Sequence, residues 1–116
     1  MDIKVIDSPK GKLSRCALDA EARITSVSDF LDLLANCPTD TVVIDRECLT
    51  EGFFDLKSGI AGEFLQKVSN YRKRLIILGD YRGLASKALR DFIHESNQTG
   101  QVIFTDELRH AIKLLS

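Results

Sequence analysis

The 116-residue sequence predicts one α/β domain: an N-terminal β-hairpin, then alternating strands and helices, with a mixed, mainly parallel sheet of about five strands and four helices. Three short apolar runs predict strands that are covered on both faces. They lie at Thr41–Asp45, Arg74–Asp80 and 101–104. A segment with apolar residues at helical spacing follows each run. Such alternation favours parallel strands joined by right-handed crossovers.

The first two strands are expected to form a hairpin. Apolar and polar residues alternate over Ile3–Ile6 and again over Leu13–Leu18, as is typical of strands with one face on a core. The segment between them contains Pro9 and Gly11, which favour a turn. A turn this short predicts that the two strands pair in antiparallel orientation.

A first helix is expected to begin at Ser26 and to end before Pro38. Asp29 lies three residues after Ser26 and completes a pattern that resembles a capping box. Apolar residues then follow at helical spacing, namely Val27, Phe30, Leu31 and Leu34. Pro38 ends the pattern because proline lacks the N–H that a helix interior needs.

Three further helices are expected, over about Ser58–Tyr71, over Leu84–Asn97 and after Thr105, which is predicted to cap the last helix. Each has an apolar stripe that is predicted to pack on the sheet. The stripes are Ile60, Ala61, Phe64, Leu65, Val68 and Tyr71, then Ala85, Ala88, Leu89, Phe92 and Ile93, then Leu108, Ala111, Ile112 and Leu115. No linker, repeat or low-complexity segment interrupts residues 1–116, so a single domain is predicted.

Composition narrows the class of protein. Hydrophobic residues make up 44% of the chain and charged residues 28%, which is ordinary for a soluble globular protein and argues against disorder. The net charge of -1 predicts no nucleic-acid partner. No apolar run approaches the roughly 20 residues of a membrane span, so no membrane partner is predicted.

The three cysteines, Cys16, Cys37 and Cys48, are odd in number and show no C-x-x-C spacing. We interpret them as buried thiols of a reduced cytoplasm, rather than as a disulfide framework or zinc ligands. The first residues of the chain lack the long apolar core of a signal peptide. A cytoplasmic protein without a metal centre or cofactor is therefore expected.

Two glycines near the start of the second predicted helix are the least expected residues of the sequence, because a glycine inside a helix costs roughly 0.5–1 kcal/mol relative to alanine. At 100° per residue, Gly59 and Gly62 fall on the face away from the apolar stripe, together with Glu63 and Gln66. One interpretation is that a partner approaches this face closely. The other is a local one, in which Gly59 serves a turn and Gly62 faces a neighbouring loop.

Ser58 is predicted to lie where this helix begins. A helix N-terminus offers unpaired N–H groups and a partial positive charge, which suit a capping hydroxyl and also stabilise a phosphate. Ser58 is therefore expected either as a simple N-cap or as a phosphorylation site. Phosphorylation would add about -1.5 to -2 charge beside Asp55, Lys57 and Glu63.

Several stretches of the sequence resemble those of two known families. VVID, FFDLKSGIAG, RLIILGD and FTDELRHAIKLL, in this order, resemble the STAS domain of bacterial anti-sigma-factor antagonists. FFDLKSGIAGEFLQK, NYRKRLIILGD and LRDFIHESN are similar more closely to a bacterial family catalogued as domain-of-unknown-function family 4180. The resemblance implies a STAS-like fold and a regulatory protein; no activity is established for family 4180.

The STAS resemblance also implies a switch. The serine before the motif glycine is the phosphorylated residue of the antagonists, and its modification by a partner kinase releases that partner. By position this serine is Ser58, followed by Gly59, with Asp55 as the motif aspartate and Gly62 as the later glycine. Two residues separate Asp55 from Ser58, where the STAS motif has one.

Two functions from different classes are thus predicted. The first is a non-catalytic interaction domain whose partner is an anti-sigma-type kinase or a second copy of the chain. Its partner-binding residues are Asp55, Lys57, Gly59, Gly62, Glu63 and Gln66. The alternative is a small-ligand-binding protein or small enzyme that uses the carboxyl ends of the strands, with Asp45 and Asp80 as ligand-binding residues. No catalytic residue is predicted, because neither His94 nor His110 is placed beside a nucleophile or a set of metal ligands.

Overall fold

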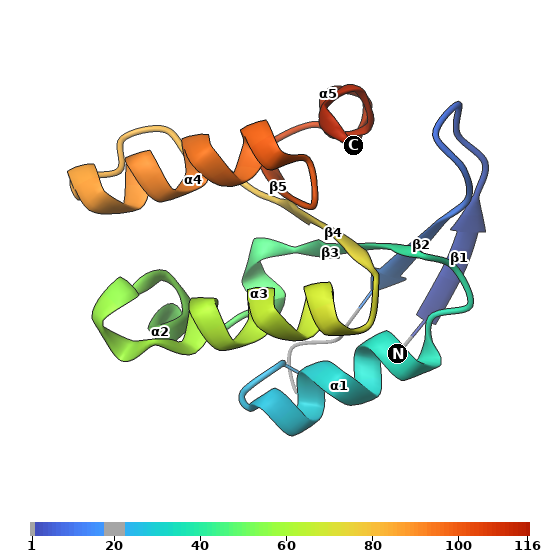
Figure 1. The fold of residues 1–116 in the computed structure, drawn as a ribbon, viewed down its shortest axis with the longest axis horizontal. Helices are drawn as coiled ribbons and strands as arrows, with labels where there is room; N and C mark the ends of the chain where they lie inside the picture. Colours follow the sequence, from blue (N-terminus) through green and yellow to red (C-terminus); the bar gives the residue numbers. More distant parts are fainter. Residues whose placement is uncertain (1, 18–22) are drawn as a thin grey trace.

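The computed structural model describes residues 2–17 and 23–116 and has one five-stranded sheet (Figure 1). The spatial order of the strands equals their order in the chain. They are β1 (Asp2–Ile6), β2 (Leu13–Ala17), β3 (Thr41–Asp45), β4 (Arg74–Leu78) and β5 (Val102–Thr105). β1 pairs with β2 in antiparallel orientation, and all the other pairs are parallel. The predicted hairpin and mixed, mainly parallel sheet are confirmed.

Four helices have seven or more residues, in agreement with the four that were expected. They are α1 (Val27–Asn36), α3 (Ile60–Asn70), α4 (Lys87–Thr99) and α5 (Leu108–Leu114). A short helix α2 (Glu51–Phe54) and two single 3₁₀ turns, η1 (Arg46–Cys48) and η2 (Leu56–Ser58), occupy the segment that was expected as a polar loop between β3 and α3.

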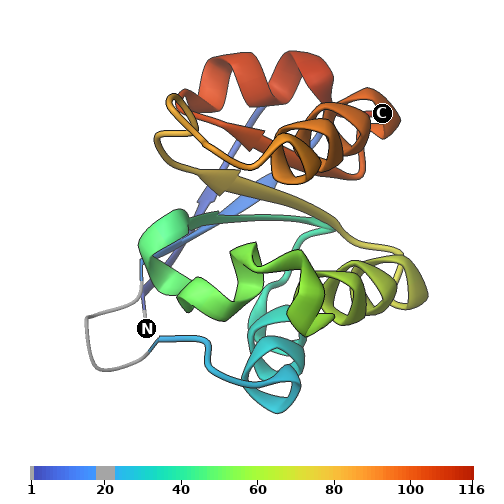
Figure 2. The same cartoon turned by 90° about the vertical axis from the view of Figure 1, so that its left-hand side faces the viewer.

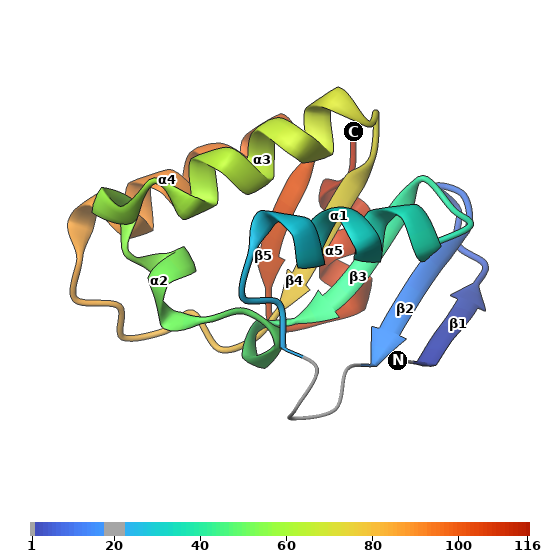
Figure 3. The ribbon, with the colours of Figure 1, turned by 90° about the horizontal axis from the view of Figure 1, so that it is seen from below.

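The helices cover the sheet unequally. α1 and α3 lie side by side on one face, and α5 lies behind the strands on the other (Figure 3). The strand order explains this arrangement, because right-handed crossovers between successive neighbours place every connecting helix on the same side. Side chains of α1, α3 and α4 accordingly share one buried cluster, whereas Ala111 and Leu115 belong to a second cluster on the opposite face.

Phenylalanine rings join the helices of the larger cluster. Phe30 of α1 and Phe64 of α3 are stacked, with ring centroids 4.4 Å apart, and Phe53 of α2 lies 5.5 Å from Phe64. Phe53 also lies 6.4 Å from Phe104 of β5. Offset and edge-on aromatic contacts of this kind add about 0.5–1.5 kcal/mol to the burial of their area. The rings therefore hold α1, α2 and α3 against the sheet as one layer (Figure 2).

The predicted capping of α1 is confirmed with one change. The Ser26 hydroxyl accepts the N–H of Asp29, as in a capping box. The Asp29 carboxylate, however, accepts the backbone N–H and the hydroxyl hydrogen of Thr25 rather than the N–H of Ser26. These bonds lower the pKa of Asp29. α1 ends at Asn36, two residues before Pro38, as expected.

The predicted starts of α3 and α4 were wrong by two and three residues. α3 begins at Ile60 instead of Ser58, because Gly59 adopts φ +79° and cannot continue a right-handed turn. α4 begins at Lys87 instead of Leu84, because Ser86 is the residue whose hydroxyl accepts the N–H of Leu89. Ala85 and Ala88 are consequently exposed rather than part of the buried stripe.

Two single residues also differ from the prediction. Thr105 does not cap α5, because it is the last residue of β5 and its carbonyl accepts the N–H of Gly79. Glu107 occupies the cap position instead. Tyr71 does not pack on the sheet and is 57% exposed, because it follows the last turn of α3 and the chain reverses at Arg72, which has φ 54°.

Candidate functional site

The predicted docking residues lie on the surface, around the start of α3. Asp55, Lys57, Gly59, Gly62, Glu63 and Gln66 are all exposed. The Asp55 carboxylate accepts the backbone N–H of Lys57, which fixes the turn η2. The Gln66 amide donates to Asn70 along the exposed side of α3. The structure therefore brings the six residues to one accessible surface, which we call the α3 surface.

The two glycines of the α3 surface have different explanations. Gly59 adopts a left-handed conformation that favours glycine, so its local role as the turn between η2 and α3 is sufficient. Gly62 has ordinary helical geometry and is exposed. Apart from the backbone of α3 itself, no atom of the described residues lies within 4 Å of where a Cβ of residue 62 would be. A neighbouring loop, the second local explanation, is therefore not what makes residue 62 a glycine.

Ser58 precedes the cap position of α3 and is tied into the turn before it. Its hydroxyl lies 2.7 Å from the carbonyl oxygens of both Gly52 and Asp55, to which it donates. It also accepts the N–H of Ile60, the first residue of α3, at 3.2 Å. The expectation that Ser58 is the N-cap was wrong by one residue, because Gly59 occupies that position. The residue itself is exposed.

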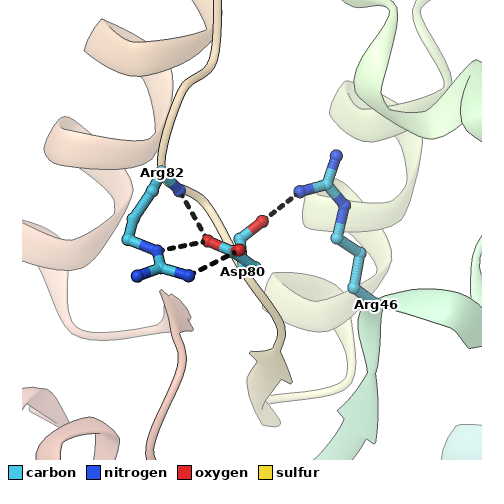
Figure 4. Close-up of polar contacts among 3 residues, drawn as sticks. All are labelled: Arg46, Asp80 and Arg82. Atoms are coloured by element: carbon cyan, nitrogen blue, oxygen red, sulfur yellow. Dashed lines mark hydrogen bonds and ion pairs between the residues drawn. The ribbon is translucent and has the colours of Figure 1, made fainter.

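The predicted ligand residues Asp45 and Asp80 both lie at the carboxyl end of the sheet, but each binds a different arginine. Arg15 of β2 donates to the carboxylate of Asp45 at 2.8 Å. Arg82 donates to the carboxylate of Asp80 through its backbone N–H and two guanidinium nitrogens (Figure 4). These bonds lower the pKa of Asp80 to about 2. The two carboxylates do not form an acid pair.

Arg46 is the residue at this edge that the sequence prediction missed. It follows β3, and its guanidinium lies 4.6 Å from the ring centre of Phe54 and 5.2 Å from that of Tyr81. One of its nitrogens donates to the backbone carbonyl of Asp80, which joins the segments after β3 and β4 (Figure 4). Such cation–π contacts contribute about 0.5–2 kcal/mol each.

Gly79 is the sequence signal that could have revealed this contact. A Cβ atom at residue 79 would lie 2.6 Å from Cβ of Arg46, closer than real Cβ contacts allow. Gly79 also has no positive φ, so backbone conformation does not account for it. A glycine directly after a buried strand is a signal of close approach by another segment, and here the approaching segment is the stem of Arg46.

Two depressions open at the carboxyl end of the sheet. One has a volume of about 340 Å³ and is lined by Arg23, Arg46, Glu47, Leu49, Thr50, Glu51 and Phe54. The other has a volume of about 270 Å³ and is lined by Asp80, Tyr81, Arg82, Thr105, Asp106 and His110. Asp80 lines the second depression, and its carboxylate faces Arg82. A small-ligand function at this edge stays a prediction.

Within residues 2–17 and 23–116, no group of three or more His, Cys, Asp and Glu side chains is arranged to hold a metal ion. Over the same ranges, no helix combines the length and the apolar character that crossing a membrane requires.

A comparison with models of known protein families gives a match. A family model described as a domain of unknown function (DUF4180) matches residues 12–115. No curated protein matches the chain, and no solved structure matches it. The match covers β2 to α5 and therefore includes both the α3 surface and the carboxyl end of the sheet.

Proposed function

Because the chain belongs to family 4180, a family of domains of unknown function whose description names no activity, we propose its function from the geometry. The protein is a non-catalytic regulatory domain that docks a protein partner on the α3 surface. The order of elements, a hairpin followed by strand–helix pairs, supports a bacterial STAS-like domain, since the resemblance of the sequence to that family predicts this order.

The observation that carries the proposal is the exposed Gly62. An added Cβ atom at this position would meet no other part of the described structure within 4 Å, and a residue such as alanine would strengthen α3. Glycine therefore costs stability without a contact in the domain that requires it. What glycine does provide is a bare helix surface, against which the backbone of another molecule can pack closely.

The charge of the α3 surface indicates which kind of partner would bind it. The α3 surface carries the carboxylates of Asp55 and Glu63 but a single cation, Lys57. A partner that offers basic groups around a close backbone contact fits this surface, because complementary charge guides and orients association. A second copy of the chain, in a two-fold contact, would bring together two surfaces of the same net negative charge. A different protein is thus the occupant that we propose.

Gly62→Arg is the substitution that tests docking. The native host's lysate is passed over the immobilised wild-type chain, and the retained protein is purified and titrated against wild type and variant. We expect Gly62→Arg to weaken binding at least about tenfold by blocking close approach. The same substitution should raise the free energy of unfolding by about 0.5–1 kcal/mol, because arginine favours a helix more than glycine does.

Ala88→Arg is the matched control, since Ala88 is a small, exposed residue near the start of another helix, α4. It should leave binding unchanged. The docking proposal fails if Gly62→Arg binds the purified partner as tightly as wild type does. Sedimentation of the chain alone identifies the competing case, in which the partner is a second copy and Gly62→Arg converts a dimer into a monomer.

Phosphorylation of Ser58 would regulate the same surface. The hydroxyl hydrogen now bridges the carbonyls of Gly52 and Asp55, and a phosphate would replace this donor with acceptor oxygens. Repulsion from the two carbonyls would move the phosphate toward the N–H groups at the start of α3, where a helix N-terminus stabilises it. The turn η2, which contains Lys57, and the adjoining Gly59 would move with it, so phosphorylation would change the α3 surface.

The Ser58 switch is tested by the intact mass of protein purified from its own host under several growth conditions. We expect a phosphorylated fraction that is absent from Ser58→Ala and that does not bind the purified partner. Ser58→Ala itself should lose about 1 kcal/mol of stability through the missing hydrogen bonds and still bind. The absence of any phosphorylated form would contradict the switch. It would not affect the docking proposal, which Gly62→Arg tests separately.

A further inference from the structure

Two of the three buried cysteines form a pair. Cys16 lies in β2 and Cys37 directly follows α1, and their sulfur atoms are 3.3 Å apart. Both residues are almost fully buried, at 0% and 4% exposed. They are 21 positions apart in the sequence, so their spacing gave no sign of the pairing. The prediction of buried cysteines is confirmed, and the fold adds that two of them are in direct contact.

The surroundings give the two thiols different acidities. The hydrogen bond from Cys16 and then the nearby positive charge of Lys73 lower the pKa of Cys37. The Lys73 ammonium is held in place by the carbonyls of Cys37 and Thr39, at 3.2 and 2.7 Å. The hydrogen bond to Cys37 and burial raise the pKa of Cys16. Cys37 is therefore the more acidic thiol of the pair, and the thiolate is the reactive form of cysteine.

We propose that Cys16 and Cys37 are a redox-active pair that forms an intramolecular disulfide by exchange with a small-molecule disulfide of the glutathione type. The contact distance of 3.3 Å has to shorten by roughly 1 Å to reach the sulfur–sulfur bond length of about 2.05 Å. This pairing is independent of any partner bound at the α3 surface.

The exchange proceeds in two displacements. The Cys37 thiolate attacks one sulfur of the small disulfide, forms a mixed disulfide and releases one small thiolate. The Cys16 thiol then loses its proton to that thiolate and attacks the sulfur of Cys37, which releases the second small thiolate. Two electrons pass from the cysteine pair to the small disulfide, and one protein disulfide is formed. The small disulfide ends as one thiol and one thiolate, and this thiolate takes up from solvent a proton equivalent to the one that Cys37 had lost.

The cross-link would tie the end of α1 to β2. A disulfide across a loop of this length stabilises a domain mainly by restricting the unfolded chain. From that effect and the size of the domain, we expect the oxidised protein to melt about 10 °C higher than the reduced protein. The disulfide would thus attach α1 covalently to the sheet, in addition to the stacked contact between Phe30 and Phe64 that joins α1 to α3.

Tryptic peptides of the wild-type chain test the pairing directly, because the three cysteines fall in different peptides, 16–23, 24–46 and 47–57. The folded chain is equilibrated with mixtures of reduced and oxidised glutathione, denatured, alkylated and digested. We expect peptides 16–23 and 24–46 to appear joined, with Cys48 alkylated, and the intact mass before alkylation to fall by two hydrogen atoms. Loss of both effects on adding a reductant shows that the bond is reversible.

Cys48→Ser is the matched control, because Cys48 is a third buried cysteine, and it should form the disulfide as wild type does. Cys16→Ser and Cys37→Ser should not form it or show the melting shift. The proposal is overturned if the wild-type peptides stay unjoined in fully oxidised glutathione, or if the bond that forms involves Cys48. These two outcomes are read from wild-type protein and do not depend on the folding of any variant.

Discussion

Phe64→Ala is expected to lower the free energy of unfolding by about 3–5 kcal/mol, the usual range for removing a buried phenylalanine from a core. Phe64 is 2% exposed, and its ring contacts those of Phe30 and Phe53. Truncation to alanine would leave a cavity where α1, α2 and α3 meet, and the stacked pair would be lost as well. Urea unfolding, monitored by circular dichroism, measures the change. The midpoint urea concentration should fall, while the dependence of the unfolding free energy on urea (the m value) stays nearly constant.

Phe92→Ala is the control. It shows how much stability is lost when an aromatic ring outside the centre of the core is removed. Phe92 lies on α4, is half-buried and contacts Phe104 at 6.0 Å between ring centres. Its truncation should cost clearly less than that of Phe64, because water already reaches part of its surface. Equal costs for the two substitutions would contradict the central position that we assign to Phe64.

Gly79→Ala is expected to destabilise the domain by about 1–3 kcal/mol, the range for inserting a methyl group into packed structure. The new Cβ would meet Cβ of Arg46 at 2.6 Å. Arg46 has little room to retreat, because its guanidinium lies against the rings of Phe54 and Tyr81 and donates to the carbonyl of Asp80. Thermal and urea unfolding of the purified variant measure the cost.

A double-mutant cycle with Arg46→Gly identifies the cause. If Gly79→Ala destabilises the domain through its clash with the Arg46 stem, the same substitution should cost little stability in protein that already carries Arg46→Gly. The coupling energy between the two substitutions should then be about 0.5–3 kcal/mol. Additive costs would show that Gly79 is required for another reason. Gly62→Ala is the control, since nothing lies within 4 Å of its added Cβ and a gain of about 0.5–1 kcal/mol is expected.

The sequence predicted the regular elements well where the signal was local. The strands at Thr41–Asp45 and around Arg74–Leu78 were found in their predicted places because continuous apolar runs of that length are typical of covered strands. Helix starts were less accurate. Residue type predicts Ser58 and Thr105 as caps, and the apolar stripe predicts a start at Leu84. The chain instead uses Gly59, Glu107 and Ser86 as the cap residues.

The candidate site was predicted only in part. The exposed face with Gly62, Glu63 and Gln66 followed from helical periodicity alone, and the structure places it on the surface. The partners of Asp45 and Asp80 did not follow, because Arg15 lies on a strand far away in the sequence and Arg82 meets Asp80 only through the shape of the turn. Side-chain contacts of this kind leave no periodic pattern.

What the sequence by itself determined is therefore the alternation of strands and helices, the mainly parallel sheet and the polar face of α3, since each depends on periodicity along one segment. Only the tertiary structure decided the contact between Cys16 and Cys37, the position of Arg46 between two aromatic rings, and the bonds that hold Ser58. The physical reason is that these contacts depend on how separate segments and turns pack in space, which no periodic pattern along one segment records.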